Sequence, residues 1–157
     1  MPDVTPELAE PEDARAVRAL VRTAYAPYVP RVGREPAPMN EDYVKAIEDG
    51  DVHVVRDAGA VVAVLVTRGR DDHLLIENIA VEPGRQGSGL GGQVLGWAEA
   101  RAASLGYGEV RLYTHVTMVE NIAFYGRHGY EVTRVAEEDE FRRVHFRKVL
   151  HRPGESP

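Results

Sequence analysis

The pattern of hydrophobic and polar positions predicts an amphipathic helix near the start of the chain. Apolar residues recur at steps of three and four, the spacing of one helical face: Ala14, Val17, Val21, Ala24 and Tyr28. Residues 11–13, a proline and two acids, suit the first turn of this helix. Pro27 and Pro30 are expected to end it, because proline disrupts a helix interior.

A proline-rich segment and a second, short helix are predicted next. Residues 31–39 contain two prolines, a glycine and two arginines, a composition typical of a loop. Asn40 is a suitable N-cap for a helix that ends at Gly50. Its inward positions are expected to be Tyr43, Val44 and Ile47.

Valine-rich or alternating segments predict strands in the rest of the chain. The expected strands cover residues 52–56, 60–67, 74–81, 110–116, 130–135 and 141–149, after a short extended piece at 4–8. Two further helices are expected at residues 90–105 and 121–128, closed by Gly106 and Gly129, and acidic residues 137–139 predict the last turn.

This order of elements predicts the fold class. The predicted fold class is α+β, with a three-layer-like arrangement similar to that of α/β folds. We expect a mixed, mostly antiparallel sheet and about four helices. Residues 1–150 are expected to form one domain and 151–157 a polar tail, because 157 residues suit a single domain.

Composition and charge exclude several classes of protein. The formal net charge of −6 has the wrong sign for a general nucleic-acid binder. The absence of cysteine excludes a disulfide scaffold, a cysteine nucleophile and a cysteine-ligated metal, and the six scattered histidines offer no zinc-helix pair. The chain has no apolar run long enough for a membrane span and does not open on a signal peptide. We therefore expect a cytoplasmic protein with no metal, nucleic-acid or membrane partner.

The most informative motif joins a predicted strand to a predicted helix. Residues 79–92 read IAVEPGRQGSGLGG, and Arg85 adds a cation. Glycines let the backbone approach a bulky anion, and the free N–H groups of a helix start point at it. The run lacks the Gly-Lys-Ser/Thr of a Walker loop, and residues 82–86 separate the strand from the glycines, unlike a Rossmann fingerprint. The motif predicts a pyrophosphate cradle, and the alternative is a glycine-rich connection without a ligand.

Two motifs together resemble the GNAT superfamily of acyl-CoA-dependent N-acetyltransferases. The family's Gln/Arg-x-x-Gly-x-Gly/Ala signature is similar to residues 86–91, preceded by a strand that ends Ile-Ala-Val. A second signature, tyrosine followed by glycine and an aromatic residue, is similar to Tyr125, Gly129 and Tyr130. The resemblance covers nearly the whole chain and implies the GNAT fold.

The resemblance also implies a site for acetyl-CoA, which acts as co-substrate. Backbone amides of the cradle would hold the pyrophosphate: Gln86, Gly87, Ser88, Gly89, Leu90 and Gly91. Along the strand Ile79-Ala80-Val81, the backbone of Ile79 and Val81 would pair with the pantetheine arm. An amide of Val81 or Ile79 would polarise the thioester carbonyl.

By the same resemblance, Tyr125 would protonate the departing CoA thiolate as a general acid. The alternative is a core aromatic. The family's pantetheine-binding asparagine lies seven residues before this tyrosine, where the chain has Met118. Asn121, four residues before Tyr125, is therefore open to two interpretations, cofactor contact or helix cap.

A chain without cysteine cannot form an acyl-cysteine, so direct attack of an amine on acetyl-CoA in a ternary complex is expected. A protonated alkylamine must lose a proton to a base. Glu77, His115 and Glu120 are the candidates. The alternatives are a chain of waters that carries the proton and, for Glu77 and His115, a simple role as polar positions of alternating strands.

The expected acceptor is a small-molecule amine or a peptide or protein amine. Residues 25–39 are the expected acceptor wall, and the alternative is a surface loop whose arginines are solvated. Members of the family often pair their C-terminal strands, which leaves the oligomeric state open between monomer and homodimer. Two other functions stay open: a non-catalytic acyl-CoA-binding or regulatory module on the same fold, and a dinucleotide oxidoreductase, which the loop position disfavours.

Overall fold

A computed structural model describes residues 5–150, which divide into two compact units. The described part of unit 1 comprises residues 5–67 and 77–97, and that of unit 2 comprises 68–76 and 98–150. The polar tail at 151–157 and the first residue of the extended piece, Val4, lie outside the described residues. A single domain over residues 1–150 stays a prediction.

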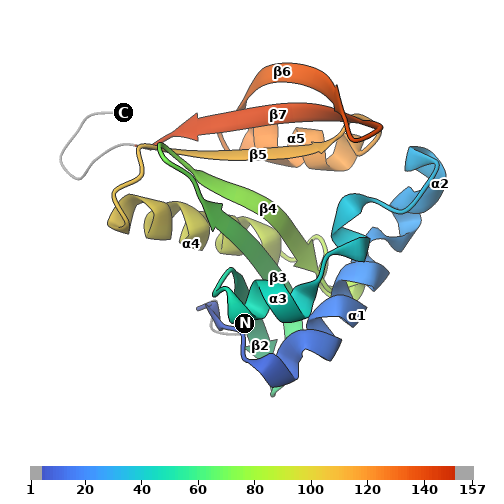
Figure 1. The fold of residues 1–157 in the computed structure, drawn as a ribbon, viewed down its shortest axis with the longest axis vertical. Coiled ribbons are helices and arrows are strands. Elements are labelled where there is room, and N and C mark those ends of the chain that lie inside the picture. Colours follow the sequence, from blue (N-terminus) through green and yellow to red (C-terminus); the bar gives the residue numbers. More distant parts are fainter. Residues whose placement is uncertain (1–4, 151–157) are drawn as a thin grey trace. The chain divides into compact units, whose positions relative to one another are not determined.

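Seven strands form one mixed sheet in the order β1-β2-β3-β4-β5-β7-β6 (Figure 1). Their bounds are β1 Glu7–Leu8, β2 Val52–Asp57, β3 Ala60–Gly69, β4 Leu74–Val81, β5 Glu109–His115, β6 Glu131–Glu138 and β7 Phe141–Val149. The pairs β1–β2, β2–β3, β5–β7 and β6–β7 are antiparallel, whereas β4–β5 is parallel. The predicted α+β class with a mostly antiparallel sheet is confirmed.

The first helix of unit 1 ends just before Pro27, as expected, but two further helical turns follow it. Helix α1 covers Ala14–Tyr25, and the turns η2 (Ala26–Tyr28) and α2 (Val29–Val32) follow without a break. Pro27 and Pro30 each fall at the first or second position of a new turn, where the missing N–H costs nothing. Gly33, with a φ of 89°, ends the helical path. The expected loop at 31–39 is therefore wrong in part, since its end also forms a turn, η3 (Ala37–Asn40).

Helix α3 covers Tyr43–Glu48, and Asp42 caps it rather than Asn40. The Asp42 carboxylate accepts a hydrogen bond from the N–H of Lys45 at 3.1 Å. Asn40 is already the last residue of η3. Tyr43 and Ile47 are buried as predicted, but Val44 is 58% exposed, so its inward assignment is wrong.

The core of unit 1 lies where α1 and α3 pack beside the valine-rich faces of β2 and β3 (Figure 1). Its fully buried members include Val17, Val21, Val52, Val54 and Val64. Burial of large aliphatic side chains supplies most of the stabilisation of such a core. Hydrophobic periodicity therefore selects the faces that the structure buries.

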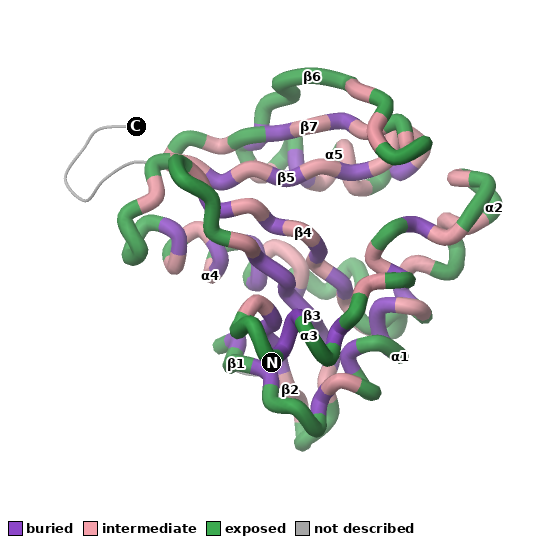
Figure 2. Tube along the Cα trace, in the orientation of Figure 1, coloured by how far each residue is buried: buried purple, intermediate pink, exposed green. Residues whose placement is uncertain are grey.

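Unit 2 is built from β5, β7, β6, the start of β4, helix α5 (Val119–Arg127) and the end of helix α4 (Leu90–Ser104). Strand β5 alternates as predicted, with Val110, Leu112 and Thr114 buried. Strand β6 runs to Glu138, so the predicted turn is two residues later, at Asp139 and Glu140, which both have positive φ. Figure 2 shows β6, an edge strand, as largely exposed. Within residues 5–150, no helix has the length and apolar character needed to cross a membrane.

Candidate active site

The glycine-rich loop in unit 1 connects the end of β4 to the start of α4 through the turn η4 (Pro83–Arg85). Gly87 and Gly89 have φ angles of 83° and 91°, a region that favours glycine. A Cβ added to either residue would meet no atom within 4 Å. Glycine is therefore required by the backbone conformation, and the loop surface in front of it is open.

Hydrogen bonds within the loop fix its shape and leave the helix start available. The Gln86 side chain donates to the carbonyl of Val81 at 3.2 Å, and the Ser88 hydroxyl donates to the carbonyl of Arg85. The first intrahelical bond of α4 runs from the N–H of Gln93 to the carbonyl of Gly89 at 3.1 Å. The N–H groups of Gly91 and Gly92 precede that bond, so they point out of the helix end. A helix N-terminus of this kind attracts anions.

Arg85 contributes less charge to the loop than the sequence predicts. Its guanidinium pairs with Asp57 at 2.7 Å and with Glu82 at 3.1 Å. The hydrogen bond that Arg85 donates to Asp57, followed by the one it donates to Glu82, raises the pKa of Arg85. Because both partners are carboxylates, its positive charge is already balanced, and anion binding here depends on backbone N–H groups.

Strand β4 alternates between exposed and buried side chains as it leads into the loop. Glu77, Ile79 and Val81 are partly exposed on one face, whereas Asn78 and Ala80 are buried on the other. Ala80 therefore offers a ligand only its backbone. Glu77, a candidate base, lies on the same face as the two residues predicted to pair with pantetheine.

Asn78 is a buried polar residue that no sequence motif marks as functional. It is 5% exposed, and its Oδ1 accepts a hydrogen bond from the Tyr25 hydroxyl at 2.7 Å. Its Nδ2 donates to the Tyr43 hydroxyl at 3.4 Å, which itself donates to the carbonyl of Pro38 at 2.6 Å. The available signal was a polar residue at an inward position of a strand. This network ties α1, α3 and residues 37–40 to β4.

Tyr125 lies in unit 2 on α5 and is 8% exposed. Its ring contacts the aromatic rings of Phe124, Tyr130 and Phe146, with centroids 5.3–5.9 Å apart. The inward orientation expected for a core aromatic is present. Packing holds the ring in one orientation, as a proton donor also requires.

Asn121 does not cap α5. Met118 occupies the N-cap position, and Asn121 is the third residue of the helix. The Asn121 side chain donates to the hydroxyl of Thr114 at 3.4 Å and to the sulfur of Met118 at 3.7 Å. Of the two interpretations, the helix cap is wrong, and cofactor contact stays a prediction.

His115 is held at the end of β5 by Thr117. The N–H of Thr117 donates to Nδ1 of His115 at 3.2 Å, and the Thr117 hydroxyl lies 2.8 Å from the same atom. Burial, and then the nearby Arg143 guanidinium, lower the pKa of His115, which favours the neutral ring. A backbone N–H donated to Nδ1 favours the tautomer of the neutral ring with its proton on Nε2. His115 thus presents an N–H donor rather than a basic lone pair.

The predicted site residues therefore fall into two groups. Unit 1 contains Glu77, the strand residues 79–81 and the cradle residues 86–91, whereas unit 2 contains His115, Asn121 and Tyr125. Glu120, the third candidate base, is exposed on the first turn of α5. Among residues 5–150, no group of three or more His, Cys, Asp or Glu side chains could hold a metal ion.

The fold and the loop define an α+β protein in which a mixed sheet leads into a glycine-rich helix start. The sequence model described as the acetyltransferase (GNAT) family matches residues 16–130, more than half of the chain. The chain therefore belongs to the acetyltransferase (GNAT) family, and it is an enzyme of the acyltransferase class. A comparison with curated proteins gave no match.

Solved structures show the same fold. The PaiA N-acetyltransferase of Thermoplasma acidophilum, solved with coenzyme A, has a TM-score of 0.78 and 16% identity, over 93% of this chain and 98% of that one. The ribosomal-protein-S18-alanine N-acetyltransferase of Escherichia coli has a TM-score of 0.75 and 18% identity, over 98% of this chain and 97% of that one. Naa20 of Chaetomium thermophilum, solved with a bisubstrate analogue, has a TM-score of 0.68 and 18% identity, over 93% of this chain and 86% of that one.

Proposed function

We propose that the enzyme transfers an acetyl group from acetyl-CoA to an amine. The observation that carries this proposal is the open helix start after β4, with left-handed Gly87 and Gly89 and outward N–H groups at Gly91 and Gly92. This arrangement suits a pyrophosphate. The coenzyme A in the similar PaiA structure supports the same ligand.

In this proposal the backbone of residues 86–91 holds the pyrophosphate, and the backbone of Ile79 and Val81 pairs with the pantetheine arm. Asn121 contacts the cofactor through its side-chain amide. Ala80 takes part through its backbone, since its side chain is buried.

The amine attacks the thioester carbonyl directly in a ternary complex. The new N–C bond forms, the C–S bond breaks, and the CoA thiolate takes its proton from the hydroxyl of Tyr125. An amide of Val81 or Ile79 stabilises the negative charge on the carbonyl oxygen.

A base must also remove a proton from the amine. Hydrogen bonding at His115 favours Glu77 for this role, because the Nδ1 of His115 already accepts the Thr117 N–H. His115 then acts as a hydrogen-bond donor. Glu77 acts directly or through water.

The acceptor is a small-molecule amine or a peptide or protein amine, and the similar structures include an enzyme named for a ribosomal protein. Residues 25–39 form its wall, and their rigidity supports this role. Arg22 donates to the carbonyl of Met39 at 2.9 Å and pairs with Glu35 at 2.6 Å, which fixes the segment against α1. We also expect a cytoplasmic enzyme, and light scattering will decide between monomer and homodimer.

Thermal unfolding with acetyl-CoA, CoA, NADH and ATP tests the ligand. A ligand at 100 times its Kd stabilises the folded state by about 2.7 kcal/mol, which shifts the midpoint by several degrees. The proposal expects a shift with the two CoA compounds only. A larger shift with NADH would contradict it and favour the oxidoreductase alternative.

Turnover separates catalysis from simple binding. Release of free CoA from acetyl-CoA is measured with a thiol reagent, and a protein without cysteine gives no background. A panel of small amines and peptide N-termini is screened in this way. CoA binding with no turnover on any amine, and no effect of Tyr125→Phe, would favour the non-catalytic module.

A further inference from the structure

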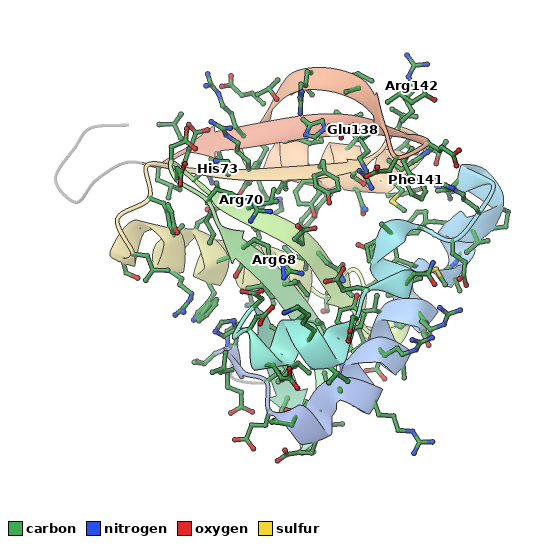
Figure 3. All side chains as sticks on the ribbon, viewed as in Figure 1. Arg68, Arg70, His73, Glu138, Phe141 and Arg142 are labelled. Atoms are coloured by element: carbon green, nitrogen blue, oxygen red, sulfur yellow. The ribbon has the colours of Figure 1, made fainter. Side chains whose placement is uncertain are left out.

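A cavity of about 470 Å³ lies in unit 2 against strands β5, β6 and β7 and the start of β4. Half of its ten lining residues are basic, and none is acidic: the basic ones are His73, Arg111, Arg134, His145 and Arg147. Figure 3 labels His73, one of these residues. The volume is in the range of small-molecule sites, roughly 300–1,000 Å³. No step of the proposed acetyl transfer uses this cavity.

The strand register brings like charges together at this cavity. Arg111 of β5 is directly opposite Arg147 of β7. Like charges at directly opposed positions destabilise a sheet. Two facing arginines therefore need negative charge nearby.

Carboxylates supply part of that charge, but they contact the guanidiniums from the side. Glu131 accepts from Nε of Arg147 at 2.8 Å, and Glu109 accepts from Nε of Arg111 at 2.9 Å. Glu131 raises the pKa of Arg147, whereas Arg111 lowers it by a smaller amount, as expected for neighbouring guanidiniums.

This arrangement leaves terminal amino groups available. Within residues 5–150, the two Nη atoms of Arg147 have no hydrogen-bond partner. Of the two Nη atoms of Arg111, only Nη2 has a partner within these residues, and this partner, Asp72, lies at the long distance of 3.5 Å. Guanidiniums fixed through Nε present their terminal N–H groups as a rigid fork, the geometry that binds carboxylate and phosphate.

An aromatic wall adjoins the two arginines. Tyr113 lines the cavity two residues from Arg111, and the guanidinium of Arg143 lies 4.7 Å from the centroid of its ring. Leu75 adds apolar surface. A ligand bound here would therefore place an anionic group at the arginines and a planar or apolar part against Tyr113.

We propose that this cavity binds a small molecule carrying a carboxylate or a phosphate group, which is held by the terminal N–H groups of Arg111 and Arg147. The site is independent of the glycine-rich cradle and does not require that the enzyme bind CoA.

Calorimetric titration of the full chain at constant ionic strength tests the proposal, with succinate and inorganic phosphate as separate probes. The site predicts saturable binding of one of them, and the comparison tells carboxylate from phosphate. Arg147→Gln should weaken that binding about tenfold or more, because it removes a charge-assisted hydrogen bond. Glu131→Gln should tighten it, because glutamine keeps an acceptor for Nε of Arg147 and removes a competing negative charge.

Arg127→Gln is the matched control, since Arg127 is exposed on α5 and the substitution changes the net charge equally. It should leave the affinity unchanged. Arg147→Gln should also leave the thermal shift with CoA unchanged, which separates this site from the cradle. Absence of saturable binding of both probes would overturn the proposal, and so would equal affinities of the wild type and Arg147→Gln.

Discussion

The hydroxyl of Tyr25 donates to Oδ1 of Asn78 over 2.7 Å, and this bond joins the last residue of α1 to the strand that leads into the glycine-rich loop. Asn78 is buried, so loss of its side chain leaves polar groups without this partner and creates a void. We expect Asn78→Ala to lower the free energy of unfolding by about 1–3 kcal/mol. Urea denaturation measures the change.

A double-mutant cycle with Tyr25→Phe shows whether the hydrogen bond itself carries the effect. If it does, Tyr25→Phe will cost less in the Asn78→Ala background than in the wild type, by roughly 0.5 kcal/mol or more. Strictly additive losses would show that Asn78 acts through packing alone.

The strands and most helices could be predicted because their apolar periods are local properties of the sequence. The same rules failed where two local signals competed. Val44 is apolar yet exposed, since α3 is short and turns that position outward, and Asp42 caps α3 because Asn40 already belongs to another turn. Helix α1 ends just before Pro27 as expected, but the helical turn that follows was missed, because proline also fits the first turn of a new helical segment.

The candidate site, like the fold, could be predicted from the sequence only in part. The cradle could be predicted, because its glycines follow each other along the chain. The Asn78 network and the facing pair Arg111 and Arg147 could not, since each depends on residues that the fold brings together over long sequence separations. The orientation of the His115 ring depends on the turn at Thr117, which alternation along β5 does not report.

Gly89 offers a test of the cradle through its backbone. An alanine at a φ of 91° is strained, so Gly89→Ala should lower the free energy of unfolding by roughly 1 kcal/mol. Its new methyl group would also project into the open space in front of the loop and weaken CoA binding. Urea denaturation and the thermal shift with CoA measure the two effects.

Gly84→Ala is the control, because a Cβ there also meets no atom within 4 Å but Gly84 does not have a left-handed φ. It should be close to neutral in both measurements. If Gly89→Ala left CoA affinity at the wild-type value, backbone approach at Gly89 would not be part of the cradle.

The ion pair between Asp13 and Arg56 should make stability depend on acid pH. Arg56 donates to the carboxylate of Asp13 at 2.7 Å, and this hydrogen bond lowers the pKa of Asp13. A lowered pKa in the folded state means that the stabilisation is present above the unfolded value, about 3.9, and is lost as the pH falls through the folded value.

Asp13→Asn should therefore lower the free energy of unfolding at pH 7 by about 1–3 kcal/mol and flatten its acid dependence. Asp49→Asn removes an equal charge from an exposed pair with Lys45 and should cost no more than about 0.5 kcal/mol. Urea denaturation from pH 7 down to pH 3 measures both variants. An unchanged acid slope in Asp13→Asn would show that other carboxylates dominate.

The choice between Glu77 and His115 as the base can be made by matched substitutions. Glu77→Gln removes the proton acceptor and should lower kcat by about a hundredfold. His115→Gln keeps a hydrogen-bond donor and should retain most activity, because Nδ1 of His115 is already occupied by the Thr117 N–H. Steady-state kcat values measured across pH 5–10 test this assignment. A larger loss of kcat in His115→Gln than in Glu77→Gln would assign the base to His115.

Tyr125 as a general acid gives the most direct test of the proposed chemistry. Tyr125→Phe keeps the ring and its contacts with Phe124 and Phe146 but removes the proton that the thiolate needs. We expect kcat to fall about a hundredfold, with the alkaline limb of the pH–rate profile lost and KM for acetyl-CoA little changed. Tyr130→Phe is the control, since the neighbouring Tyr130 hydroxyl donates to Glu99 at 2.9 Å and should affect stability rather than kcat. If Tyr125→Phe kept both the wild-type kcat and the alkaline limb, Tyr125 would be a core aromatic and the thiolate would take its proton elsewhere.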